Sequence, residues 1–115
     1  MAQERLRVEN TASARDGLRV LRCQGPLTMG TVSALQGAVR SENAATVIID
    51  LSEVPYIDSA GLGSLVHAYI SYKRAGRRLA LVGVNERAGA LLQMTNVEHL
   101  FPIFPSLGEA ERGLA

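Results

Sequence analysis

The stretch Pro55-Tyr56-Ile57-Asp58-Ser59-Ala60-Gly61-Leu62-Gly63 joins two segments of the chain that have different apolar patterns. Upstream, residues 46–51 read Thr-Val-Ile-Ile-Asp-Leu, a short β-branched run that is typical of a buried strand. Downstream, apolar residues recur with the period of an amphipathic helix: Leu62, Leu65, Val66, Tyr69 and Ile70. The nonapeptide is therefore predicted to be a corner between a strand and a helix, and Leu65, Val66, Tyr69 and Ile70 are predicted to be mainly buried against a sheet.

Two features of this corner concern the first turn of the predicted helix. Asp58 or Ser59 is suited to cap the helix, because a short side-chain oxygen accepts hydrogen bonds from the free N–H groups of the first turn. Gly61 and Gly63 weaken the helix where it begins, each by about 1 kcal/mol relative to alanine. We interpret the two glycines as leaving this turn with little side-chain cover, so that a large partner can approach Ser59.

The rest of the chain alternates strands with helices. Apolar alternation at 6–9 and an apolar run at 18–23, separated by a turn at 13–17, predict an N-terminal hairpin. Two more strands are predicted over 78–84 and 100–104, and the second is placed at a sheet edge because proline interrupts it. Helix caps are predicted at Thr28, Asn85 and Ser106.

The helix after Thr28 is predicted to extend to about Arg40, with its buried side chains being Met29, Val32, Leu35 and Val39. The central helix is expected to end at Gly76, after basic residues that suit the negative end of the helix dipole. The predicted order is β-β-α-β-α-β-α-β-α, in a single domain over residues 1–115. Such alternation predicts an α/β fold with a mixed, mostly parallel sheet of about five strands packed against helices.

Composition excludes several classes of function. The chain has 115 residues, enough for one core, and 47% of them are hydrophobic. Twelve basic residues balance eleven acidic ones, which gives no support to direct nucleic-acid binding. No segment approaches the roughly 20 apolar residues of a membrane span, and the first residues lack an apolar signal core. Cys23 is the single cysteine, which excludes an internal disulfide and favours a reducing cytoplasm.

Catalytic chemistry finds little support. As a hydrolase nucleophile, Ser59 needs a base, and the sequence offers only His67 and His99. His67 is expected to face solvent, and His99 is expected at the wrong end of a parallel sheet. If Ser59 were only a helix cap, the presence of Gly61 and Gly63 in the same turn would have no explanation. The glycine pair lacks the third glycine or lysine of a nucleotide fingerprint, and no cluster of metal ligands is present.

Two polar positions outside the corner have structural interpretations. Asp50 is expected to be a hydrogen-bonding group near the end of its strand. Met94-Thr95 is interpreted as a contact between the end of a helix and the core.

The hexapeptide Asp58-Ser59-Ala60-Gly61-Leu62-Gly63 resembles the signature of STAS domains, specifically of bacterial anti-sigma factor antagonists. The resemblance includes the strand before the motif, the Met94-Thr95 pair, and the order of the elements over almost the whole chain. It implies a STAS fold over 1–115 and a regulatory protein that is not an enzyme and has no cofactor.

The resemblance also implies partners. The unphosphorylated protein would bind an anti-sigma factor of the histidine-kinase-like ATPase fold and free a sigma factor. That partner would phosphorylate Ser59 with ATP and dissociate, and a PP2C-type phosphatase would reverse the change. The implied partner surface is Asp58, Ser59, Ala60, Gly61, Leu62, Gly63, Gly25, Pro26 and Thr28. Alternatives are a STAS scaffold module of a transporter or signalling assembly and, from another class, a small serine hydrolase or nucleotide-binding enzyme.

One departure from the family pattern concerns the loop before the first helix. Antagonists of the family commonly carry Gly-Glu-Leu-Asp there, whereas this chain reads Gly25-Pro26-Leu27-Thr28. Both acids are missing, and in the family this loop helps to bind the anti-sigma partner. The departure therefore bears on the identity of the partner and on the affinity for it.

Overall fold

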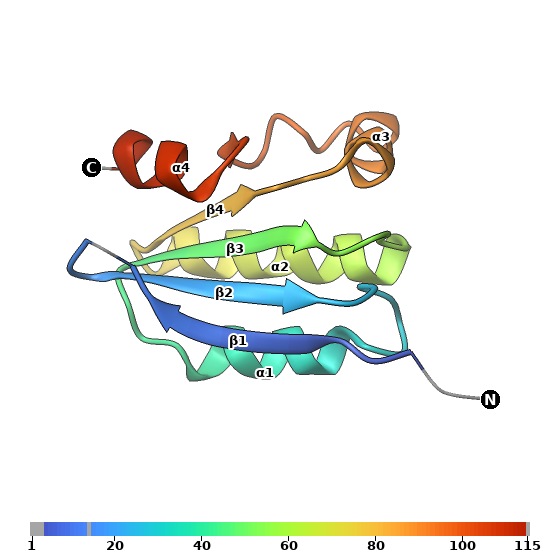
Figure 1. The fold of residues 1–115 in the computed structure, drawn as a ribbon. Helices are drawn as coiled ribbons and strands as arrows, with labels where there is room; N and C mark the ends of the chain where they lie inside the picture. The colour runs from blue at the N-terminus through green and yellow to red at the C-terminus, as the bar shows by residue number, and fades with distance from the viewer. Residues whose placement is uncertain (1–3, 14, 115) are drawn as a thin grey trace.

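In the part of the chain that the structure describes, five strands form one sheet, in which their spatial order is also their order along the chain (Figure 1). The computed structural model describes residues 4–13 and 15–114, so Ala14 of the predicted hairpin turn lies outside the described residues. The first two strands are antiparallel and the other pairings are parallel, which confirms the predicted mixed sheet. The strands are β1 (Arg7–Ala12), β2 (Leu18–Gln24), β3 (Thr46–Glu53), β4 (Arg78–Val82) and β5 (Ile103–Phe104).

The predicted alternation of strands and helices is confirmed, with helices on both faces of the sheet. The helices are α1 (Val32–Ser41), α2 (Ser59–Arg74), α3 (Glu86–Met94) and α4 (Leu107–Gly113). Along β3, Val47, Ile49 and Leu51 pack in the cluster that contains side chains of α1, α2 and α3. Ile48 points to the other face, into a smaller cluster with α4. Burial on both faces explains why Val47, Ile48 and Ile49 are consecutive apolar residues in this strand.

The start of α1 differs from the prediction. The helix begins at Val32 with Thr31 as its N-cap residue, so the predicted cap at Thr28 is wrong. The backbone at Thr28 forms a turn in which its carbonyl accepts hydrogen bonds from the N–H groups of Thr31 and Val32, each at 2.9 Å. The turn places Met29 outside the helix, where 78% of it is exposed, so its predicted burial is also wrong.

The buried face of α2 is rotated relative to the predicted one. Leu65 is fully buried as expected, but Ile70 is 40% exposed, and Val66 and Tyr69 are half-buried. Tyr72 is buried instead, and its hydroxyl donates to the carbonyl of Val39 at 3.1 Å. The complete set of buried residues in this helix is Gly61, Leu62, Ser64, Leu65, Ala68 and Tyr72.

The C-terminal part confirms the caps at Asn85 and Ser106, whose side chains accept from N–H groups in the first turns of α3 and α4. The last strand occupies the predicted edge but has only two residues. The expected core contact at the end of α3 is wrong, because Met94 is 83% exposed and Thr95 is exposed too. The helix ends here, and the chain reverses through Asn96, which has a positive φ of 60°.

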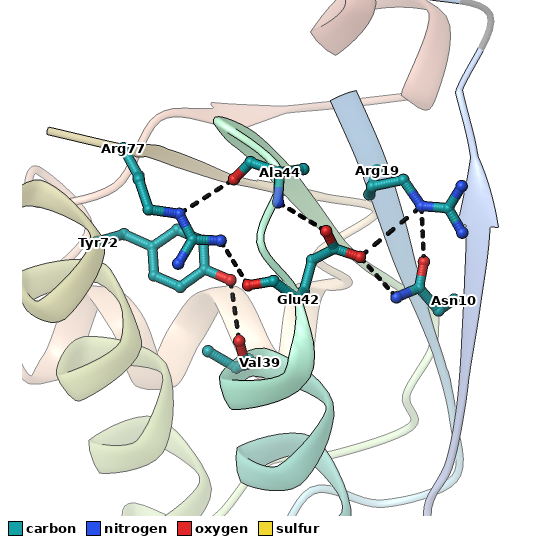
Figure 2. Close-up of polar contacts among 7 residues, drawn as sticks. All are labelled: Asn10, Arg19, Val39, Glu42, Ala44, Tyr72 and Arg77. Carbon is teal, nitrogen blue, oxygen red and sulfur yellow. Dashed lines mark hydrogen bonds and ion pairs between the residues drawn. The ribbon is translucent and has the colours of Figure 1, made fainter. Parts of the chain in front are cut away.

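At the end of the sheet where α1 finishes, Glu42 joins three segments (Figure 2). Its carboxylate accepts from the amide of Asn10 in β1 and from the N–H of Ala44, each at 2.7 Å. Arg19 of β2 lies 3.7 Å away as an ion-pair partner. The hydrogen bond from Asn10 is the main cause that lowers the pKa of Glu42. Together, these contacts of Glu42 hold the C-terminal end of α1 against the hairpin formed by β1 and β2.

Candidate functional site

The corner between β3 and α2 is organised by the carboxylate of Asp58. Asp58 is the N-cap residue of α2, and its Oδ1 accepts from the N–H of Gly61 at 2.8 Å. Its Oδ2 accepts from the N–H of Met29 at 3.0 Å. The hydrogen bond from Gly61 is the main cause that lowers the pKa of Asp58. Asp58 rather than Ser59 is therefore the cap, and it is ionised at neutral pH.

The loop that follows β2 lies beside this corner. The N–H of Leu27 donates to the carbonyl of Tyr56, and the N–H of Asp58 donates to the carbonyl of Leu27, each at 3.1 Å. Leu27 and Ile57 thus form an isolated parallel bridge. The structure therefore brings together the two segments that carry the predicted partner surface, residues 25–28 and residues 58–63.

The two glycines of the corner differ in their surroundings. Gly61 is buried, and a Cβ there would overlap the carbonyl oxygen of Leu27 and lie 2.9 Å from Cγ2 of Ile57. Gly63 is exposed, and a Cβ there would have nothing within 4 Å. Gly61 is thus required by internal packing rather than by access for a partner, whereas the interpretation as an open surface fits Gly63.

The predicted site residues divide by exposure. The most accessible of them are Ser59 and Gly63, and the partly exposed ones are Gly25, Thr28, Asp58 and Ala60. Pro26, Gly61 and Leu62 are buried and support the surface from beneath. Ser59 is the first residue of α2, so its hydroxyl lies at the positive end of the helix dipole.

Met29 is a surface residue of this site that the sequence pattern did not identify. Its backbone is bound to Asp58, and most of its side chain is exposed. The available signal was Thr31, a cap-type residue just before an apolar one, which would have placed Met29 outside the helix.

Tyr56 and Arg87 extend the same end of the molecule towards α3. The guanidinium of Arg87 lies 5.0 Å from the centre of the Tyr56 ring, within the range of a cation–π contact. The Tyr56 hydroxyl donates to Glu4, and this hydrogen bond is the main cause that raises the pKa of Tyr56.

The other chemically active side chains do not converge on Ser59. His67 is exposed and lies further along α2, about 12 Å from Ser59 at about 1.5 Å per residue. His99 is exposed in the turn after α3, 3.7 Å from Glu98. Cys23 is buried in β2, and burial is the main cause that raises the pKa of its thiol to about 12.

Asp50 has the structural role that was expected of it. Its Oδ1 accepts from the N–H of Ser52 at 2.9 Å and from the Ser52 hydroxyl at 2.5 Å. In the part of the chain that the structure describes, no group of His, Cys, Asp and Glu is placed to hold a metal ion. Among the same residues, no helix combines the length and the apolar character needed to cross a membrane.

The sequence and the fold both resemble those of known proteins. The family model described as "STAS domain" matches residues 10–110. An anti-sigma-B factor antagonist from Staphylococcus epidermidis is 32% identical over 82 residues, which cover 69% of this chain and 76% of that protein. A relative from Thermotoga neapolitana is 36% identical over 64 residues, but the match spans only 56% of this chain and 57% of that protein.

Solved structures share the fold at lower identity. The crystal structure of an anti-sigma factor antagonist from Mycobacterium paratuberculosis superposes with a TM-score of 0.82 at 23% identity, over 94% of this chain and 92% of that one. A sulfate transporter family protein from Wolinella succinogenes gives a TM-score of 0.76 at 23% identity, over 86% of this chain and 85% of that one. The same architecture therefore occurs in proteins whose descriptions differ.

Proposed function

The chain belongs to the STAS domain family, and we propose that it is an anti-sigma factor antagonist, a regulatory binding protein rather than an enzyme. In this role it binds an anti-sigma factor, and the sigma factor that the anti-sigma factor had held is released. The proposal is supported by the matched STAS model and by the anti-sigma-B factor antagonist that is 32% identical. We further propose that residues 1–115 act as one domain, and that they do so in the cytoplasm.

The observation that carries the proposed switch is the exposed position of Ser59 at the start of α2, next to an ionised carboxylate. Phosphorylation there would add about −1.5 to −2 charges. Free N–H groups and the helix dipole tolerate an anion at this end, so the fold would remain intact. The phosphate and Asp58 would instead place two like charges on the contact surface. A few kcal/mol of lost binding corresponds to a hundredfold or greater loss of affinity.

The resemblance supports a more specific set of partners. The anti-sigma factor would have a histidine-kinase-like ATPase fold and would phosphorylate Ser59, and a PP2C-type phosphatase would remove the phosphate. The loop at residues 25–31 contains no carboxylate and presents Thr28 and the exposed Met29 instead. We therefore propose that the partner meets this loop with an apolar surface rather than with a basic one.

The test begins with purification of the tagged, unphosphorylated protein from its native cells and identification of the bound partner. The partner is then produced separately and incubated with ATP and either wild type, Ser59→Ala or Ser71→Ala. Ser71 is exposed on the same helix but lies far from the corner, so it serves as the matched control. We expect phosphate on wild type and Ser71→Ala but not on Ser59→Ala, and release of only the phosphorylated proteins.

Three outcomes would contradict the proposal. Recovery of membrane transport subunits instead of an ATPase-type kinase would favour the scaffold function. Equal binding of phosphorylated and unphosphorylated wild type would remove Ser59 as the switch. Esterase activity or tight nucleotide binding by the isolated protein would favour the alternative of an enzyme.

A further inference from the structure

A second candidate site lies at the opposite end of α2 from Ser59. Here the last turns of α2, the start of β4, the edge strand β5 and the end of α4 surround a pocket of about 330 Å³. This volume lies at the lower end of the range of about 300–1,000 Å³ that is usual for small-molecule sites. Lys73, in the pocket wall, is about 21 Å from Ser59 along the helix axis at about 1.5 Å per residue. The pocket is therefore separate from the proposed contact surface.

The polar part of the wall consists of three cations, Lys73, Arg77 and Arg78. The guanidinium of Arg77 stacks on the ring of Tyr72 at 3.8 Å (Figure 2). Its Nε donates to the carbonyl of Ala44 at 3.0 Å, and one Nη donates to the carbonyl of Glu42 at 2.7 Å. Stacking and two backbone contacts fix this guanidinium, so that Arg77 forms a rigid, positively charged part of the wall.

Arg78 is held in a similar way, since its Nη1 donates to the carbonyl of Leu114 at 3.0 Å. Lys73 lies 6.0 Å from the centre of the Tyr69 ring and is exposed. Two of the three cations are thus positioned before any ligand arrives, which lowers the entropy cost of binding.

No acidic side chain lines this pocket. Among residues 4–13 and 15–114, none of the salt bridges involves Lys73, Arg77 or Arg78. The chain as a whole carries a net charge of only +1, so the positive charge of the pocket is local and does not reflect a generally basic surface. Within the described part of the chain, an anion that enters the pocket would meet these cations without a competing acidic side chain in the wall.

The remaining wall is apolar and partly aromatic: Tyr69, Leu79, Pro102, Phe104, Gly113 and Leu114. Phe104 packs directly on Gly113, where a Cβ would lie 2.8 Å from the ring's Cζ. Because residue 113 has no side chain, the ring of Phe104 can pack directly against α4. A flat apolar group of a ligand can pack against this wall while its anionic group reaches the cations.

We propose that this pocket binds a small organic anion in which an aromatic ring is joined to a phosphate-like dianion. Guanidinium groups match the geometry of phosphate oxygens, and the ammonium of Lys73 adds a third charge. The proposal goes beyond the anti-sigma function and does not depend on it.

The test uses phenyl phosphate as the probe in a titration of the ¹⁵N-labelled protein, followed by amide NMR shifts. We expect saturable shifts around the pocket, at residues 73–79, 102–104 and 113–114, with an affinity in the millimolar range typical of a fragment. Inorganic phosphate and phenol, titrated separately, should each bind more weakly, because each provides only half of the recognised chemistry. Added salt should weaken the binding of phenyl phosphate.

Matched variants locate the binding. Lys73→Gln removes a charge from the pocket, whereas Arg74→Gln removes one from the neighbouring exposed residue, which does not line it. We expect Lys73→Gln to weaken binding about threefold to tenfold and Arg74→Gln to leave it unchanged. Circular dichroism checks that both variants are folded. Absence of saturation, equal effects of the two variants, or inorganic phosphate binding as tightly as phenyl phosphate would overturn the proposal.

Discussion

The carbonyl oxygen of Leu27 lies against the Cα of Gly61, in the space where any other residue would carry its Cβ. The same oxygen accepts the N–H of Asp58 at 3.1 Å. The loop after β2 can therefore dock on the start of α2 only because position 61 has no side chain. This contact sets the geometry of the surface that contains Ser59.

Gly61→Ala is expected to destabilise the protein by about 1–3 kcal/mol, because the added methyl group must displace the backbone of Leu27. Gly63→Ala provides the matched control in the same helical turn. Its Cβ meets no neighbouring atom, so it is expected to stabilise the protein by up to about 1 kcal/mol through helix propensity. Urea unfolding of both variants checks this, and a loss of stability in Gly63→Ala comparable to that in Gly61→Ala would contradict it.

The rotated face of α2 predicts different costs for two aliphatic residues of the helix. Leu65 has 0% exposure, so Leu65→Ala is expected to cost about 2–5 kcal/mol of unfolding free energy. Ile70 is 40% exposed, so Ile70→Ala is expected to cost less than about 1.5 kcal/mol. Denaturant unfolding measures both. Similar losses for the two variants would mean that the helix faces the sheet in the register of the apolar pattern instead.

Asp58→Asn tests the double role of the carboxylate. An amide has one acceptor oxygen, so it can keep the N–H of Gly61 while the N–H of Met29 loses its acceptor. Hydrogen exchange followed by NMR is expected to show faster exchange at Met29 with little change at Gly61. Unchanged protection of both amides would show that the contact with Met29 is not formed in solution.

The lowered pKa of Asp58 also predicts a dependence on pH. A carboxyl group whose pKa is lower in the folded than in the unfolded state stabilises the protein above its unfolded pKa. This contribution is lost as the pH falls through the folded pKa. The stability difference between wild type and Asp58→Asn is therefore expected to be largest near neutral pH. It should shrink between about pH 5 and about pH 2, as followed by thermal unfolding across that range.

Ser59→Asp is expected to weaken binding to the anti-sigma partner by about tenfold or more, because it adds a second negative charge beside Asp58. The fold should not suffer, since an acidic residue at the first helical position interacts favourably with the dipole. Ser71→Asp adds the same charge on the same helix away from the corner and should bind like wild type. Calorimetric binding and thermal unfolding of both variants check this, and equal weakening by the two would indicate a general charge effect.

Most of the fold was predictable because its signals are local. The β-branched run of β3, the caps at Asn85 and Ser106 and the hairpin depend on neighbours within a few positions, and the structure confirms each of them. For α2 the sequence left Asp58 and Ser59 as alternative caps, and the structure selects Asp58. The errors fall where such signals compete. Thr28 and Thr31 both resemble caps, and only the turn between them decided that α1 begins at Val32.

The candidate site was predicted in part. The motif around Ser59 identified the corner, and the resemblance to STAS proteins assigned the loop after β2 to the same partner surface. The exposed Met29 was missed, and the proposed reason for Gly61 was wrong, because both depend on contacts between the two segments. The pocket that contains Lys73 had no signal in the sequence, because its wall comes from four separate elements.

The sequence by itself determined the order of strands and helices, the capping of α2 by a short polar residue and the position of the serine at its start. These features follow from the spacing of apolar residues and from hydrogen bonds between residues that are close in the sequence. Both are local properties of the chain. Only the tertiary structure decided that Asp58 also binds an N–H 29 positions away, that Gly61 faces a backbone carbonyl and that Ile70 faces solvent. The reason is that these contacts depend on how the sheet aligns distant segments and on how α2 rotates against it, and neither quantity is encoded in any short stretch of residues.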